Sequence, residues 1–243
     1  MSTVKEKNVF NIAIKGNFDD CQKIVKSLFE RNNHNSKLNL AAVNSINWVR
    51  IMGQIVYYFW AYLKCAKDFE KINYSIPTGN FGNVYAGYIA KKMGLTIKKL
   101  IVASNSNDVL TRFFESGVMK KHRTVTTLSP SMDIQVSSNF ERLLYDYLRK
   151  DSNLINGYFS DLNQRDMFTI EKKVLKRILT IFQGFRLNDK ATKESSRKIY
   201  KKYNHLIEHH TAVGIEDGRE NLIHNELNVY LATAHYGKLL NTV

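Results

Sequence analysis

Hydrophobic and polar positions follow one another along this chain in blocks that predict strands and helices in turn. Apolar runs of strand length occur at Val9–Ile14, Asn73–Pro77 and Lys99–Ala103. Segments with apolar residues at helical spacing follow or separate them, from Asp19 or Asp20 to about Phe29, from a Ser45 cap to Leu63, from Val84 to Met93, and from Asp108 to Glu115. This rhythm predicts an α/β fold with a mostly parallel sheet flanked by helices.

The pattern changes after residue 139. Residues 129–139 are irregular and polar, and three helical segments follow, at Phe140–Arg149, Ile170–Phe182 and Ser195–Ile207. Asn188–Ser196 has the composition of a linking stretch, and Tyr230–Ala234 predicts a late strand. We therefore expect an α/β portion over residues 1–139 and a helix-rich portion over residues 140–243 whose late strand packs back on the sheet.

Composition narrows the class of protein. The 243 residues contain no apolar run close to the ~20 that a membrane span needs, and the amino terminus lacks a secretion-signal pattern. Two cysteines, Cys21 and Cys65, suit neither a disulfide framework nor a metal site. We expect a reducing cytoplasm, no metal, and a Cys21 side chain in the core.

The net charge of +14 raises the alternative of a basic nucleic-acid-binding module. Lysine and arginine are spread along the whole chain, however, and no RNA-recognition, zinc-finger or basic-zipper pattern accompanies them. A solvated lysine-rich surface is therefore the favoured interpretation, with no nucleic acid and no membrane as partner.

The segment Tyr74–Asn83, YSIPTGNFGN, is the most informative for chemistry. A predicted strand leads into a turn with Gly79 and Gly82, and a helix begins directly after it. Unpaired amides and the positive end of the helix dipole make such a turn a site for a phosphate group, and Asn80 and Asn83 add side-chain donors. An ordinary strand-to-helix turn is the alternative, because glycine and asparagine are common in turns.

Several segments together resemble the threonine synthases. IPTGNFGNVYAGYIAKKMGL is similar to the phosphate-binding loop of that family, which uses pyridoxal phosphate (PLP) and has the tryptophan-synthase-β-like fold, PLP fold type II. Further resemblances occur in family order, in GNFDDCQ, NSINWVR, NSND, SPSMDIQVSSNFER, HHTAVG and TAHYGK. The resemblance implies that residues 1–139 hold the PLP phosphate and that the chain has part of this fold.

The resemblance also implies roles for individual residues. Cofactor-binding positions are Gly79, Asn80, Phe81, Gly82, Asn83 and Thr233, with the Thr233 hydroxyl near the pyridine nitrogen. Substrate-binding candidates are Asn47, Arg50, Asn107 and Asp108. Arg50 would receive an anionic group, and its alternative is a helix-surface arginine. Asp108 has the alternative of a helix cap, and His210 and His235 are expected to be structural.

The reaction of the family converts O-phospho-L-homoserine and water into L-threonine and phosphate. It is classed with the carbon–oxygen lyases that act on phosphates, and it is the last step of threonine biosynthesis. The Schiff-base lysine of the family lies in an FKD motif before GNFDDCQ, and this sequence has no matching position, so the implied set of catalytic residues is none. Lys67, in CAKDF, stands at the end of a helix and out of family order. We expect a threonine synthase fragment, inactive alone, that works with a separate amino-terminal piece, and the alternative is a catalytically dead remnant. Such a fragment should expose an apolar patch.

Overall fold

A computed structural model describes residues 4–16, 18–32, 39–66, 71–220 and 226–239. The described chain divides into two compact units, residues 1–40 and 41–243, and each is considered by itself. The expected boundary after residue 139 does not coincide with this division.

The described residues of the smaller unit include the helix α1 (Phe18–Asn32). The helix is where the pattern predicts it, but Asp19 and Asp20 lie in its first turn rather than at its cap. The strand predicted at Val9–Ile14 is absent, because these residues pair with no other strand among the described residues. Phe10 and Ile12 are about four-fifths exposed, at 79% and 82%. The prediction that Cys21 lies in the core is also wrong, because the Cys21 thiol is exposed.

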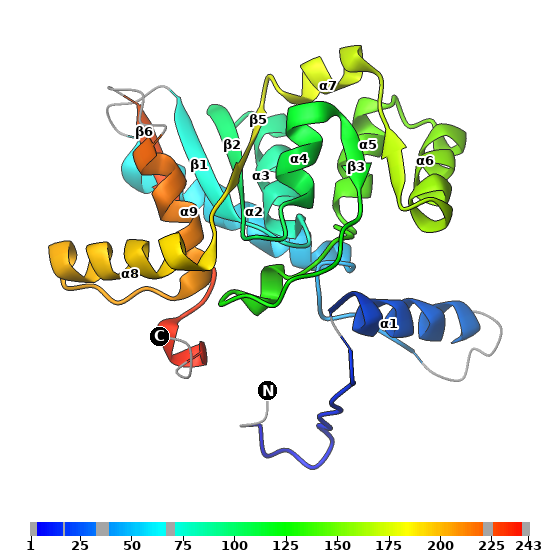
Figure 1. The fold of residues 1–243 in the computed structure, drawn as a ribbon, viewed down its shortest axis with the longest axis horizontal. Coiled ribbons are helices and arrows are strands. Elements are labelled where there is room, and N and C mark those ends of the chain that lie inside the picture. The colour runs from blue at the N-terminus through cyan, green and yellow to red at the C-terminus, as the bar shows by residue number, and fades with distance from the viewer. Residues whose placement is uncertain (1–3, 17, 33–38, 67–70, 221–225, 240–243) are drawn as a thin grey trace. The chain divides into compact units, whose positions relative to one another are not determined.

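A parallel sheet of four strands organises the larger unit (Figure 1). Its spatial order is β5-β2-β1-β6, and every neighbouring pair is parallel. The strands are β1 (Ile72–Pro77), β2 (Ile97–Ser104), β5 (Phe182–Arg186) and β6 (Leu227–Tyr230). The prediction of a mostly parallel sheet flanked by helices is confirmed.

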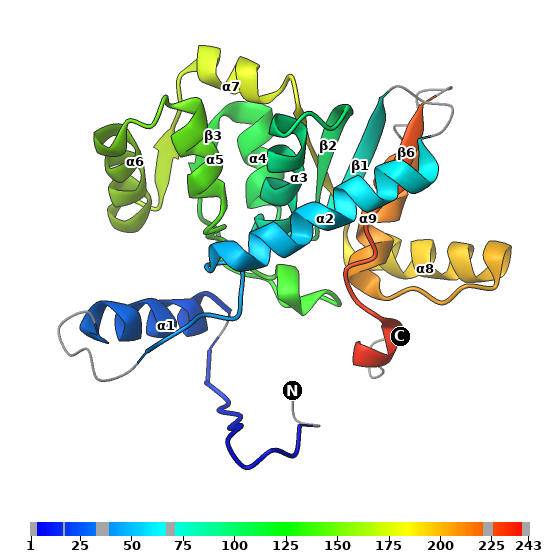
Figure 2. The ribbon, with the colours of Figure 1, turned by 180° about the vertical axis from the view of Figure 1, so that it is seen from behind.

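Helices cover both faces of this sheet, as Figures 1 and 2 show from opposite sides. One group contains α3 against β2, α4 against β2 and β5, and α2 packed on the outside of α3. The other contains α9 against β1, β2 and β6, with α8 packed on α9. Their bounds are α2 (Trp48–Cys65), α3 (Gly82–Lys92), α4 (Val109–Ser116), α8 (Asp189–Tyr203) and α9 (His209–Glu220).

A smaller group of elements lies beyond α4. It contains the antiparallel pair β3 (Val118–Lys120) and β4 (Met167–Thr169), together with α5 (Phe140–Tyr147), α6 (Ser152–Gln164) and α7 (Lys172–Ile178). Two short 3₁₀ turns, η1 (Pro130–Met132) and η2 (Tyr236–Leu239), complete the described elements.

The main core is formed by apolar residues of α2–α7 and of the strands they cover. Four phenylalanine rings lie at its centre, where Phe113 contacts Phe140 at 4.8 Å between ring centroids and Phe114 stacks on Phe182 at 6.1 Å. Phe182 is the first residue of β5, and its ring is buried against α4. Burial of such rings contributes about 2–3 kcal/mol each.

Several predictions for the second half of the chain are wrong. The helix predicted at Ile170–Phe182 is split, because α7 ends at Ile178 and β5 then begins. The predicted linker Asn188–Ser196 is the first part of α8, and the Asn188 side chain caps that helix by accepting from the Ala191 amide at 3.0 Å. The late strand does pair in parallel with β1, but it is Leu227–Tyr230 rather than Tyr230–Ala234.

Candidate functional site

The turn after β1 is fixed at both ends by the core. The Thr78 amide donates to the carbonyl of Ala103 at 2.9 Å, which continues the β1–β2 ladder. Phe81 then adopts a left-handed conformation, with φ 61°, and its ring is buried against Phe140 and Phe182. A left-handed aromatic residue is strained, and the anchored ring stabilises this conformation.

The carbonyl groups of the turn are held by the segment before α5. Ser137 donates its hydroxyl to the carbonyl of Gly79 at 2.5 Å, and Asn139 donates its side-chain amide to the carbonyl of Asn80 at 2.9 Å. A trans peptide places its N–H on the side opposite its C=O. The N–H groups of Asn80 and Phe81 therefore face away from residues 137–139.

These amides are available to a ligand. Among the described residues, the backbone amides of Asn80, Phe81 and Gly82 have no hydrogen-bond acceptor. They lie at the first turn of α3, whose Phe81 cap supplies no side-chain acceptor. Unpaired amides at the positive end of a helix dipole form a favourable site for a phosphate group.

The two asparagines of the turn differ in their side chains. The Asn80 side chain has contacts at both ends: its Oδ1 accepts from the amide and hydroxyl of Ser138, and its Nδ2 donates to Ser45 at 3.2 Å. Because Nδ2 carries two N–H groups, one side-chain donor of Asn80 remains beside its backbone amide. Asn83 accepts from the Tyr58 hydroxyl at its carbonyl, at 2.6 Å, and at Oδ1, at 3.3 Å, which leaves Nδ2 as a donor.

Both glycines are required by close packing. A Cβ on Gly79 would lie 2.8 Å from the carbonyl oxygen of Ser131, and a Cβ on Gly82 would lie 2.7 Å from the Cβ of Ser45. Neither glycine has a left-handed φ, which Phe81 has instead. The glycines thus let the turn approach neighbouring segments closely.

A cavity of about 470 Å³ opens beside this turn at the carboxyl ends of β1 and β6. Arg50, Asn83 and Thr233 line it, so the structure brings together candidates that are up to 183 residues apart in sequence, which is the separation of Arg50 and Thr233. Arg50 and Thr233 are exposed, and neither side chain has a hydrogen-bond or ion-pair partner among the described residues. Parallel sheets gather ligands at this edge, which agrees with the position of the cavity.

Gln54 is a lining residue that the sequence reasoning missed. It extends from α2 beside Arg50, and its Oε1 is buried without a hydrogen-bond partner. A buried polar atom that lines a cavity and lacks a partner indicates a place for a ligand group. The available signal was the polar interruption of the apolar run Ile51–Leu63.

Arg142 was also missed, and it supports the turn indirectly. Its guanidinium donates to Asn139 Oδ1 at 2.7 Å and to the carbonyls of Ser45 and Ile46. Asn139 in turn holds the Asn80 carbonyl. Arg142 therefore joins the phosphate turn to the residues that precede α2.

Asn47 begins α2 as its cap. Its Oδ1 accepts from the Val49 amide at 3.0 Å, and its Nδ2 donates to the Ala42 carbonyl at 2.9 Å. The predicted cap at Ser45 is therefore wrong by two residues, because the Ser45 hydroxyl accepts from Asn80 and Asn139 instead. With both ends of its side chain engaged, Asn47 positions Arg50 from the start of the same helix.

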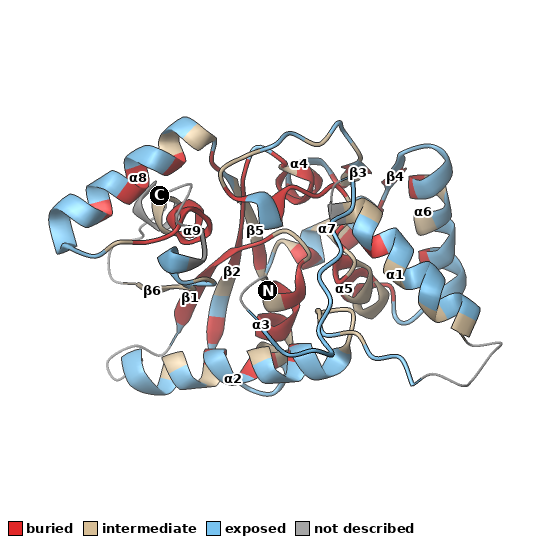
Figure 3. Cartoon of the chain, turned by 90° about the horizontal axis from the view of Figure 1, so that it is seen from below, coloured by how far each residue is buried: buried red, intermediate tan, exposed pale blue. Residues whose placement is uncertain are grey.

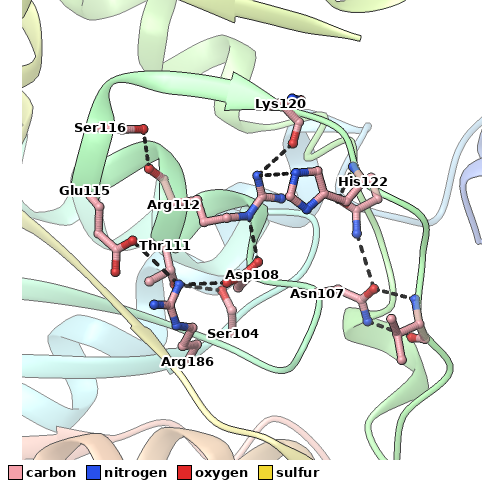
Figure 4. Close-up of polar contacts among 12 residues, drawn as sticks. Ser104, Asn107, Asp108, Thr111, Arg112, Glu115, Ser116, Lys120, His122 and Arg186 are labelled. Carbon is pink, nitrogen blue, oxygen red and sulfur yellow. Dashed lines mark hydrogen bonds and ion pairs between the residues drawn. The ribbon is translucent and has the colours of Figure 1, made fainter.

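Asn107 and Asp108 are not among the residues that line the cavity. Figure 4 shows the polar contacts around them. Asn107 is buried and donates to Asp133 at 2.9 Å and to the Val125 carbonyl at 2.8 Å. Asp108 accepts from Arg112 and Arg186, both at 2.8 Å. Burial alone would raise the pKa of Asp108, but the hydrogen bonds and charges of these two arginines outweigh it and hold that pKa below its ordinary value.

The late HHTAVG motif forms a buried helix start. Glu208 is fully buried and accepts four hydrogen bonds, from the His210 amide and ring and from the Thr211 amide and hydroxyl, at 2.6–2.8 Å. Burial would raise the pKa of Glu208, but these bonds, first those of His210, lower it. The His210 ring is thus bound to Glu208 through Nδ1, and its buried Nε2 has no hydrogen-bond partner among the described residues. His235 is exposed and accepts from the Gly237 amide at 3.1 Å.

Lys67 lies outside the described residues. Within the described ranges, no group of three or more histidine, cysteine or acidic side chains is arranged to hold a metal ion. No helix in those ranges is long and apolar enough to cross a bilayer.

The sequence and fold of this chain are similar to those of known proteins. No family model matches the chain. Threonine synthase of Saccharomyces cerevisiae is 39% identical over 264 residues, which cover all of this chain and 51% of that protein. The chain is related to the threonine synthases. It spans about half the length of the curated relatives it matches.

Solved threonine synthases have the same fold over that half. A structure described as PLP-bound threonine synthase from Brucella melitensis superposes with a TM-score of 0.86 at 43% identity and covers 95% of this chain and 50% of the other. The yeast enzyme superposes with a TM-score of 0.87 at 38% identity and covers all of this chain and 51% of its own. The expectation of part of PLP fold type II is therefore confirmed.

Proposed function

We propose that this chain is the phosphate-binding, carboxy-terminal half of a PLP-dependent threonine synthase. Its reaction would be the conversion of O-phospho-L-homoserine and water into L-threonine and phosphate. One observation carries the proposal: the carbonyls of Gly79 and Asn80 are bound by Ser137 and Asn139, which turns the amides of Asn80 and Phe81 away from those residues. With the amide of Gly82, they have no acceptor among the described residues at the start of α3.

The residues present fit the cofactor. The amides of the turn suit its phosphate group, and the adjoining cavity contains Thr233, whose hydroxyl suits a pyridine nitrogen. Asn83 contributes Nδ2, and the Tyr58 hydroxyl fixes its orientation. When bound, pyridoxal phosphate stabilises negative charge on a substrate carbon.

Arg50 is the residue of this chain best placed for the substrate. Its guanidinium lines the cavity without a competing carboxylate among the described residues. A planar guanidinium binds a phosphate or carboxylate through two parallel hydrogen bonds, in a bidentate arrangement. Arg50 would therefore bind and orient O-phospho-L-homoserine. Asn47 holds the start of the Arg50 helix, and Asn107 and Asp108 hold the loop after β2, so we assign these three residues to positioning.

The proposal includes a second piece of protein. Schiff-base chemistry needs a lysine that the resemblance places in the half of the family that this chain does not match, so that half must be supplied for turnover. We also place the chain in the cytoplasm, where the exposed thiols Cys21 and Cys65 would stay reduced.

Reconstitution tests the proposal. The chain is co-expressed with the unmatched half of the yeast threonine synthase, and phosphate release from O-phospho-L-homoserine is measured with added PLP. We expect release that requires both pieces and that falls at least tenfold with Gly82→Ala. A complex that forms and binds PLP but releases no phosphate would identify a binding remnant and contradict the catalytic assignment.

A further inference from the structure

Helix α2 has two apolar faces. One of them is covered by α3 and the core. Ile51, Ile55 and Tyr58 are buried against α3 and the core. The opposite side presents Val49, Met52, Val56, Trp60 and Leu63, spaced by three or four residues, which we call the α2 stripe. Successive residues at this spacing lie on one helix face, so the stripe is continuous along the helix.

The α2 stripe is open to solvent in the described structure. Figure 3 shows that much of α2 is coloured as exposed. The exposed fractions of its side chains run from 52% at Met52 to 72% at Leu63. Gly53 lies on the same side, and a Cβ built on it meets nothing within 4 Å. A partner backbone is thus free to approach closely there. Five large apolar side chains in one exposed row are a typical sign of an interaction surface.

Charge argues against a second copy of this chain as the occupant. α2 contains Arg50 and Lys64 near its two ends and no acidic residue. In an antiparallel two-fold pair these cations would approach one another across the contact, and in a parallel pair each would face its own copy. Either arrangement opposes like charges, and the whole chain already carries +14.

The position of the stripe indicates what covers it. α2 also carries Arg50, Gln54 and Tyr57, which line the open cavity beside the phosphate turn. The curated relatives contain a further stretch of about equal length that this chain does not match. A piece of protein that completes the cavity would therefore also lie against α2.

We propose that the α2 stripe is the docking surface for the half of a threonine synthase that this chain does not match. The partner surface is apolar at its centre, with acidic groups at the rim to meet Arg50 and Lys64. This inference rests on the proposed function for the identity of the partner. It adds which helix binds that partner and which side chains contribute the contact.

Tryptophan reports directly on this surface, because both tryptophans of the chain, Trp48 and Trp60, lie on α2. The chain is labelled with 5-fluorotryptophan, and Trp48→Phe assigns the two fluorine resonances. Unlabelled partner, the unmatched half of the yeast threonine synthase co-purified from a co-expression strain, is then titrated in without PLP. We expect the Trp60 resonance to shift with saturation.

Two double variants distinguish binding through the α2 stripe from non-specific hydrophobic association. Val56→Ser with Leu63→Ser should weaken binding at least tenfold, the loss expected for removing central apolar contacts. Tyr200→Ser with Tyr203→Ser removes exposed side chains of α8, at 52% and 59%, and should leave binding unchanged. Circular dichroism of each variant checks that it folds.

The result of the titration tests docking alone and does not depend on whether the complex releases phosphate. A Trp60 resonance unmoved by the yeast half would overturn the proposal, as would a shift that depends on the concentration of the chain alone, which would identify a second copy as the occupant. Docking through the stripe without phosphate release would support this inference while contradicting the catalytic assignment.

Discussion

At the scale of single residues, the phosphate turn depends on which way each peptide faces. The sequence predicted Gly79–Asn83 as the anion site, and the structure adds the cause, because Ser137 and Asn139 bind the turn carbonyls. That cause could not be read from the sequence, since the two segments are 58 or 59 residues apart and meet only in the fold. The same holds for the Asn80 side chain, whose contacts with Ser45 and Ser138 also join segments far apart in sequence.

Replacing Asn139 tests this orientation. Asn139→Ala removes the donor to the Asn80 carbonyl and the acceptor for Arg142. Loss of a buried hydrogen-bonding group should lower the free energy of unfolding by about 1–3 kcal/mol and should weaken PLP binding. Urea unfolding and PLP titration measure the two effects. Asn153→Ala, at an exposed position of α6, is the control and should change neither.

Gln54 gives a second residue-scale prediction. Gln54→Leu keeps the side chain's approximate size but removes the polar atoms that line the cavity. In the reconstituted complex, we expect KM for O-phospho-L-homoserine to rise several-fold while the free energy of unfolding is unchanged or slightly higher, because a buried oxygen without a partner is costly. An unchanged KM would show that Gln54 does not contact the substrate.

At the scale of elements, the spacing of apolar residues correctly predicted the helices and strands that interactions between near neighbours in sequence stabilise. β1, α3, β2 and α4 agree with the prediction within a few residues, and Gly117 ends α4 in a left-handed conformation, with φ 76°. The helix predicted over Ile170–Phe182 failed because Phe182 and the following residues gain more from pairing with β2 than from extending α7. The Val9–Ile14 strand failed because no described strand is available to pair with it.

Two carboxylates, Glu208 before α9 and Asp108 before α4, give a prediction about how stability depends on pH. The lowered pKa values of Glu208 and Asp108 mean that their carboxylates are stabilised by folding. Their contribution is present above the ordinary carboxyl pKa of about 4 and is lost as the pH falls through the lower folded values. The free energy of unfolding should therefore decrease as the pH falls below about 4.5. Glu208→Gln should flatten part of that decrease and lower stability at pH 7, as urea unfolding across pH would measure.

At the scale of the whole molecule, the chain presents the features of a part that binds another part. The α2 stripe is exposed, the cavity beside the phosphate turn is open, and Phe10 and Ile12 are exposed before α1. The sequence predicted an apolar patch only in general terms, from the resemblance. Its place on α2 required the structure, because a helix with two apolar faces looks in sequence like a fully buried helix.

The central claim is that the backbone amides after Thr78 bind the phosphate group of PLP. Nuclear magnetic resonance of the ¹⁵N-labelled chain tests it most directly, by titration with pyridoxal phosphate and, separately, with pyridoxal. We predict that the amide resonances of Asn80, Phe81 and Gly82 shift with pyridoxal phosphate, do not shift with pyridoxal, and lose the response in Gly82→Ala. Amide shifts confined to other parts of the chain, or none at these three residues, would contradict the account.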